Sequence, residues 1–129
     1  MNKMLEQVRE FHETFNCGVG DGDYVHDYAL RVKLHEEEAK EFKFATYPEH
    51  SLKELCDLLY VAFGTAIKFG WDIEEAFDRV HQSNMSKAGE DGKPIVREDG
   101  KILKGPNYFE PNLEGLIEPN KEKSHGDAS

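Results

Sequence analysis

The fold of this chain is decided by residues 34–57, which read LHEEEAKEFKFATYPEHSLKELCD. Acidic side chains recur at helical spacing on both sides of a proline-containing break. Residues three or four positions apart share one face of a helix, which pairs Glu38 with Glu41 and Glu54 with Asp57. Because the break is short, the two helices can fold back as an antiparallel hairpin. The sequence therefore predicts that these four carboxylates converge.

The second acidic pair points to a metal rather than to a solvated surface. It lies in the run ELCDLLYVAFGTAIKF, residues 54–69, where nearly every other side chain is apolar. A carboxylate is rarely buried unless it is paired or binds a metal. An all-oxygen, anionic site suits a hard cation. Glu38, Glu41, Glu54 and Asp57 are therefore predicted to bind Mg²⁺, with Mn²⁺ as an alternative.

Two simpler interpretations of the acidic residues stay open. A run of glutamates such as residues 36–38 is typical of a solvated helix face. Ser51 and Glu54 have the spacing of a capping box, in which Glu54 would only close a helix N-terminus. Asp57 fits neither interpretation, because it lies beyond the first turn of an apolar helix.

Composition restricts the classes of function. The chain has 129 residues, 38% of them hydrophobic, and a net charge of −10. This length predicts one domain. The negative charge argues against general binding to nucleic acid polymers or anionic membranes. No signal peptide and no apolar run of transmembrane length is visible, so the expected location is cytoplasmic.

Hydrophobic periodicity predicts four helices and little else of regular structure. They are expected at residues 3–15, 24–44, 51–69 and 73–87. Gly70 suits the position after a helix, and Asp72 suits an N-cap. The glycine-rich residues 16–23 lack the phosphate-binding GxxxxGK[ST] pattern and are predicted to form a flexible connection. His12 is expected at the surface or the edge of the core, and Cys56 inside it.

Arg31 is the basic side chain that precedes the acidic cluster on the predicted second helix. It is a candidate either to orient Glu38 or to contact a phosphate of a substrate. A surface ion pair with Asp27, one helical turn away, is the alternative.

Basic residues follow the last helix. Residues 87–109 read KAGEDGKPIVREDGKILKGPNYF, with a turn at Asp99 and Gly100 between short apolar segments. This pattern predicts a small β-hairpin. The polar residues 114–129 are predicted to be a disordered tail.

The acidic motif resembles that of the MazG-like all-α nucleotide pyrophosphohydrolases, whose pattern is EExxE, a spacer, then ExxD. Here the pattern reads Glu37-Glu38-Ala-Lys-Glu41, twelve intervening residues, then Glu54-Leu-Cys-Asp57. The resemblance continues through SNMSK, residues 83–87, and through the lysine-bearing segment, so that it spans most of residues 25–113.

The resemblance implies an all-α antiparallel four-helix bundle over residues 1–113, with a hairpin-like extension, assembled as a homodimer or homotetramer. It also implies an enzyme that cleaves a nucleoside triphosphate between its α and β phosphates, releasing pyrophosphate. The positions that match its nucleotide-contacting residues are Asn84 and Lys87, and Lys104 is a weaker candidate. Asn84 and Lys87 can also serve only the helix C-terminus, where a positive charge is favourable.

The residues themselves favour attack by water. No Ser/His/Asp or Cys/His arrangement of a nucleophile is visible. Phosphoryl transfer needs mainly positioning and charge stabilisation, which metal ions and carboxylates supply. Glu37 is the candidate to orient or deprotonate the water, and Glu38 is the alternative.

Other functions remain open from the sequence alone. Within the same chemistry, these are a phosphoribosyl-ATP pyrophosphohydrolase, a dGTP-preferring enzyme or a (p)ppGpp hydrolase. From a different class, acidic helices suit a non-catalytic interaction module. A di-iron site would need two ExxH units, whereas Asp78 and His81 offer at most one loose approximation.

Overall fold

The computed structural model describes residues 2–117, and the part of the predicted tail from residue 118 onward lies outside the described residues. The all-α fold class with a small hairpin is confirmed. The helices are α1 (Lys3–Thr14), α2 (Tyr24–Lys43), α3 (Pro48–Phe69) and α4 (Ile73–Met85), and the strands are β1 (Ile95–Val96) and β2 (Ile102–Leu103). None of the described helices combines the length and apolar character needed to span a membrane.

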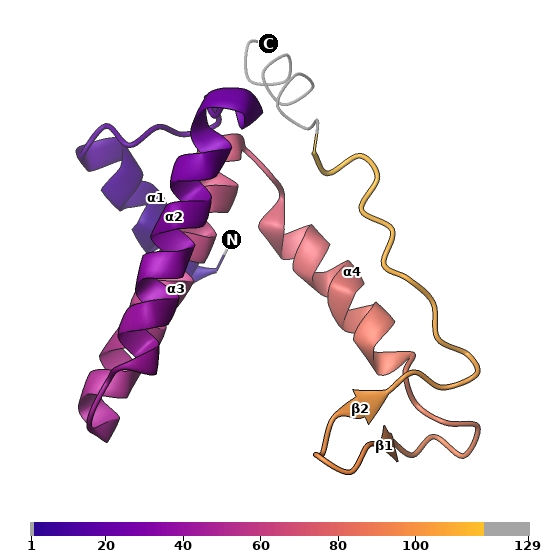
Figure 1. Cartoon of the computed structure of the whole chain (residues 1–129). Coiled ribbons are helices and arrows are strands. Elements are labelled where there is room, and N and C mark those ends of the chain that lie inside the picture. The colour runs from indigo at the N-terminus through magenta and orange to yellow at the C-terminus, as the bar shows by residue number, and fades with distance from the viewer. Residues whose placement is uncertain (1, 118–129) are drawn as a thin grey trace. The chain divides into compact units, whose positions relative to one another are not determined.

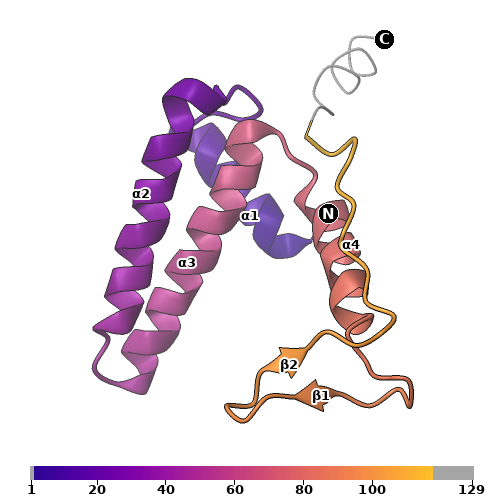
Figure 2. The same ribbon diagram turned by 45° about the vertical axis from the view of Figure 1, so that its right-hand side comes forward.

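The chain forms two compact units, one up to Trp71 and one from Asp72 to Ile117. In the first unit, α2 and α3 lie side by side and run in opposite directions, and α1 packs against α3 (Figures 1 and 2). In the second unit, the chain after the β1–β2 hairpin returns along α4 (Figure 2). The hairpin is antiparallel, with Ile95 opposite Leu103, as the turn at Asp99 and Gly100 predicted.

The start of α3 differs from the prediction. The helix begins at Pro48 after the N-cap Tyr47, so Ser51 lies inside it and closes no capping box. Proline is favoured at the first helical position because its φ is preset and its missing N–H has no partner there. Glu54 consequently lies beyond the first turn, and its carboxylate is not needed for capping.

The other helix ends follow the sequence signals. The Asp72 side chain accepts the Glu75 N–H at 3.2 Å and begins α4. Gly70 ends α3 in the left-handed region with φ 71°, which glycine adopts without a Cβ clash. The 16–23 connection is fastened to this end of α3, because the N–H groups of Gly20 and Gly22 donate to the Ile67 and Lys68 carbonyls at 2.8 Å. These bonds hold the connection against α3 at two points, whereas the sequence predicted only a flexible connection.

Polar side chains join α2 to α3. Arg31 donates from Nε to Thr65 Oγ1 at 3.0 Å and from Nη2 to the Val61 carbonyl at 2.9 Å. His35 Nε2 lies 2.8 Å from the same hydroxyl, which itself donates to Val61 O at 3.0 Å. Because α2 buries no residue completely, these directional bonds do much to set its register against α3.

Two sequence-based expectations about burial are wrong in this structure. His12 is only 4% exposed, and its Nδ1 lies 2.8 Å from the Gly18 carbonyl, so this nitrogen carries the proton and donates. Cys56 is exposed on α3. The loop that follows α1 provides the partner of His12, a contact that helical periodicity alone does not reveal.

At Gly64 on α3, side chains from both α1 and α2 come close to the helix backbone. A Cβ atom there would lie 2.8 Å from both Arg31 Nη2 and His12 Nε2. Neither group can move freely, because Arg31 is bonded to α3 and the His12 ring is buried and bonded to Gly18.

We expect Gly64→Ala to lower the free energy of unfolding by about 1–3 kcal/mol, as overpacking does. Helix propensity alone would have the opposite effect, because replacing glycine by alanine inside a helix stabilises a protein by about 1 kcal/mol. Urea unfolding measures the change. Cys56→Ala, at an exposed position of the same helix, is the control and should stay within about 0.5 kcal/mol. A Gly64→Ala protein as stable as the parent would contradict the close approach.

Candidate active site

Four carboxylates meet between α2 and α3. Glu38 and Glu41 come from α2, and Glu54 and Asp57 come from α3. One oxygen atom of each lies within 4.8 Å of the others. We refer to these four residues as the carboxylate cluster. Helical spacing explains each pair, and the short connection at residues 44–47 brings the pairs together.

Buried oxygen atoms in the cluster lack a partner. Glu54 is 3% exposed. Among the described residues, neither Glu54 Oε2 nor Glu38 Oε2 has a hydrogen-bond partner, although both atoms are buried. A buried carboxylate oxygen without a partner is costly. Four anionic oxygen ligands are the donor set that Mg²⁺ or Mn²⁺ prefers, so the residues present fit such an ion.

The electrostatics of the cluster also favour a bound cation. Burial, followed by the charges of Asp57 and Glu54, raises the pKa of Glu38 above its usual value. A side-chain hydrogen bond with Glu54 and the charges of Glu54 and Glu38 raise the pKa of Glu41. Two carboxylates can share such a bond only through a proton, and a cation between them would replace that proton.

A lysine that the sequence analysis missed contacts the cluster. Lys53 Nζ lies 2.7 Å from Asp57 Oδ2 and 3.3 Å from Glu54 Oε1. These hydrogen bonds, Asp57 first, raise the pKa of Lys53, so the amine is a cation at neutral pH. His50 Nε2 is 3.7 Å from the same Glu54 oxygen. The available signal was the i,i+4 spacing of Lys53 and Asp57, which also occurs in many surface ion pairs.

The other candidates of the first unit lie outside the cluster. Glu37 is exposed on α2, and its charge adds only a minor contribution to the raised pKa of Glu38. Arg31 binds α3 through its Nε and Nη2 atoms. The Asp27 carboxylate, the alternative partner of Arg31, accepts the Asp23 N–H at 2.7 Å.

The remaining candidates, Asn84, Lys87 and Lys104, belong to the second unit. Asn84 is exposed in the last turn of α4, and its carbonyl accepts the Lys87 N–H at 3.2 Å. Lys104 Nζ lies 4.7 Å from the centroid of the Tyr108 ring. The structure brings the backbone at Lys87 close to Gly105, because a Cβ on Gly105 would lie 2.7 Å from the Lys87 carbonyl oxygen.

Two serines of the SNMSK segment hold this arrangement. Ser83 is 2% exposed, and its Oγ donates to the Phe109 carbonyl at 2.7 Å. Ser86 Oγ accepts the Phe109 N–H at 3.1 Å. The segment that carries Lys104 is therefore fixed to the end of α4, where Lys87 lies.

The comparisons with known proteins identify the family. The family described as phosphoribosyl-ATP pyrophosphohydrolase matches residues 8–84, more than half of the chain. The chain belongs to this family. It is accordingly a MazG-like nucleotide pyrophosphohydrolase, a hydrolase that acts on phosphoric anhydride bonds. The enzyme class predicted from the sequence is confirmed, in preference to the non-catalytic module.

One solved structure similar to this pyrophosphohydrolase is that of a candidate NTP pyrophosphohydrolase from Exiguobacterium sp. 255-15. It has 23% sequence identity and a TM-score of 0.46, with 99% of each chain covered. A search of curated proteins gave no match.

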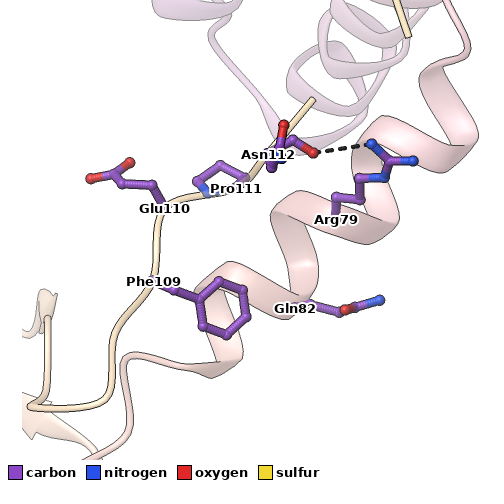
Figure 3. Close-up of a pocket in the computed structure, with 6 residues that line it drawn as sticks. All are labelled: Arg79, Gln82, Phe109, Glu110, Pro111 and Asn112. Carbon is purple, nitrogen blue, oxygen red and sulfur yellow. Dashed lines mark hydrogen bonds between the residues drawn. The ribbon is translucent and has the colours of Figure 1, made fainter. Parts of the chain in front are cut away.

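The second unit of the pyrophosphohydrolase also contains a shallow pocket of about 350 Å³ between α4 and the returning chain (Figure 3). Its lining residues are Arg79, Gln82, Phe109, Glu110, Pro111 and Asn112. Arg79 Nη1 donates to the Asn112 carbonyl at 3.1 Å and to the Glu114 carbonyl at 3.2 Å. Arg79 therefore fastens the segment that forms one wall, including residue 114 at the start of the predicted tail.

The raised pKa of Glu38 predicts how stability depends on pH without metal. Because this pKa is raised in the folded state, the folded protein holds the proton more tightly than the unfolded chain. The associated stability is fully present below the ordinary pKa of 4.5 and is lost as pH rises through the raised value.

We therefore expect Glu38→Gln to stabilise the protein at pH 7 in the presence of a chelator, by about 1 kcal/mol, a typical single-residue effect. The gain should vanish near pH 4, where Glu38 of the parent protein is protonated. Chemical unfolding at the two pH values measures it, with Glu36→Gln on the exposed face as the control. Equal gains at both pH values would show that burial and neighbouring charge do not govern Glu38.

Proposed function

We propose that the protein is a metal-dependent nucleoside triphosphate pyrophosphohydrolase, which converts a (d)NTP and water into a (d)NMP and pyrophosphate. The observation that carries this proposal is the carboxylate cluster with its two buried, unpartnered oxygen atoms. Family membership supports the pyrophosphohydrolase chemistry, and the cluster supports the need for a metal.

Glu38, Glu41, Glu54 and Asp57 would hold Mg²⁺, with Mn²⁺ as a substitute. Their oxygen atoms are close enough for one ion to contact several of them. When bound, the ion would neutralise phosphate charge and lower the pKa of a coordinated water. The protein contributes the position of the site, because α3 buries Glu54 and carries Asp57 one helical turn further along, and the Arg31–Thr65 bond fixes α2 beside it.

The water that attacks the α-phosphorus needs a proton acceptor. We assign this role to Glu37, which is exposed beside the cluster and is not one of its four members. Glu38 is the alternative, because it belongs to the cluster itself and burial beside Asp57 and Glu54 raises its pKa above the ordinary value. The proton leaves the water for the carboxylate as the bond to phosphorus forms, and pyrophosphate leaves with the electrons of the broken anhydride bond.

Asn84, Lys87 and Lys104 are the proposed contacts for the nucleotide. The tight packing of Gly105 on the Lys87 backbone supports a joint role for the two lysines, whose charges suit a polyphosphate. Arg31 already donates hydrogen bonds to Thr65 and Val61, and this favours a positioning role for Arg31 over direct contact with phosphate.

We further propose a homodimer or homotetramer located in the cytoplasm. Leu52, Leu55 and Leu59 follow helical spacing on α3 and are 61%, 44% and 43% exposed in the single chain. An apolar stripe of this kind commonly marks an interface between subunits. With a net charge of −10, free nucleotides rather than nucleic acid polymers or membranes are the proposed partners.

The matched family provides a second candidate substrate. Its description names phosphoribosyl-ATP, which carries the same type of anhydride bond as a nucleoside triphosphate. The two substrates differ in the group attached to the base, so they are distinguished by turnover and not by the metal site.

Product analysis tests the reaction. With Mg²⁺ and a panel of the eight common nucleotides plus phosphoribosyl-ATP, we expect monophosphate and pyrophosphate in equal amounts and no turnover with excess chelator. Chromatography of the nucleotides, together with a pyrophosphate-specific assay, gives both products. Release of orthophosphate alone, or activity that persists with chelator, would exclude the proposed reaction.

Asp57→Asn tests the metal site while preserving the shape of the side chain. We expect kcat/KM to fall at least about 100-fold, because a ligand charge is lost. Glu36→Gln removes an equal charge from the exposed face of α2 and should retain activity. Circular dichroism establishes that both variants fold. Full activity of folded Asp57→Asn would remove Asp57 from the metal site.

A further inference from the structure

We propose that Lys53 is a tethered counter-ion of the carboxylate cluster, which a divalent cation displaces and which then contacts the polyphosphate of the nucleotide. This inference rests on the proposed function, since it requires a metal and a phosphate at the cluster. It gives a role to a residue that the family motif, EExxE with ExxD, does not include.

The contacts of Lys53 define the competition. Its ammonium lies 2.7 Å from Asp57 Oδ2 and 3.3 Å from Glu54 Oε1, and both residues are members of the cluster. A divalent cation bound by Asp57 and Glu54 would compete with Lys53 for the negatively charged oxygen atoms of these two carboxylates. It would also repel an ammonium group held at hydrogen-bonding distance from its ligands. The two cations therefore exclude each other from this position.

The surroundings of Lys53 distinguish it from an ordinary surface lysine. An exposed i,i+4 pair on a helix contributes little by itself. Here one of the two partners, Glu54, has a side chain only 4% exposed, whereas that of Lys53 is 66% exposed. A single ammonium group faces four carboxylates, and Glu54 Oε2 stays without a partner among the described residues. The ammonium thus neutralises the cluster only in part.

The exposure of Lys53 lets the exchange proceed without disturbing the fold. The four-carbon stem is flexible, and about two thirds of the side chain is exposed. Once displaced, the ammonium remains tethered within one helical turn of Asp57. A polyphosphate drawn to the metal carries negative charge of its own, and a nearby ammonium is a suitable partner for it.

Lys53→Met separates the two consequences, because it retains the length of the side chain without the charge. We expect calorimetry to give Mn²⁺ binding about three- to tenfold tighter than in the parent protein, as loss of one ion pair implies. We expect KM for the nucleotide to rise by a similar factor. Lys33→Met makes the same charge change at an exposed site on the other helix, α2, and should alter neither quantity.

The outcomes separate this inference from the proposed function. Should the parent protein bind Mn²⁺ and Asp57→Asn lose that binding, the metal site stands. Unchanged or weaker Mn²⁺ binding by Lys53→Met, or an unchanged KM, then overturns the role of Lys53 alone. Absence of Mn²⁺ binding to the parent protein overturns the proposed function and this inference together.

Discussion

Repulsion among four carboxylates at one end of the α2–α3 pair is the constraint on which the rest of the structure depends. The helices meet at the cluster because helical spacing places two acids on each, and this meeting is unfavourable by itself. The raised pKa values of Glu38 and Glu41 record the cost. Something else must hold the two helices together along their shared length.

The opposing interaction is the bond of Arg31 to α3. Its guanidinium reaches across to the Val61 carbonyl and the Thr65 hydroxyl, and burial lowers its pKa. The α2–α3 contact therefore runs from a positive region at Arg31 to a negative region at the cluster. A half-buried guanidinium with directional bonds fixes the register of the helices, and the register fixes where the acidic oxygens lie. The site is thus held in place by groups that do not belong to it.

The sequence was sufficient for those features that local periodicity determines. The spacing of the acidic residues and the short connection predicted that Glu38 and Asp57 would lie together, because only helix geometry is involved. The start of α3 was wrong because two local rules competed, and proline at the first position prevailed over the capping box at Ser51. Burial of His12 required knowledge that the following loop folds back, which is a tertiary contact. Lys53 was missed because its spacing is shared with many surface pairs.

For the basic residues of the second unit, too, the sequence gives the residue types, and only the folded structure shows which of them lie near one another. The family match ends at residue 84, so it includes the acidic motif but neither Lys87 nor Lys104. Lys87 and Lys104 are far apart in the sequence. The structure brings their backbones together at Gly105, which follows Lys104 and contacts the Lys87 carbonyl because it has no side chain. Ser83 and Ser86 also bind the backbone of Phe109, four residues after Gly105 in the chain. The serines and the glycine are therefore as necessary to the arrangement as the lysines, because they decide where the positive charges lie.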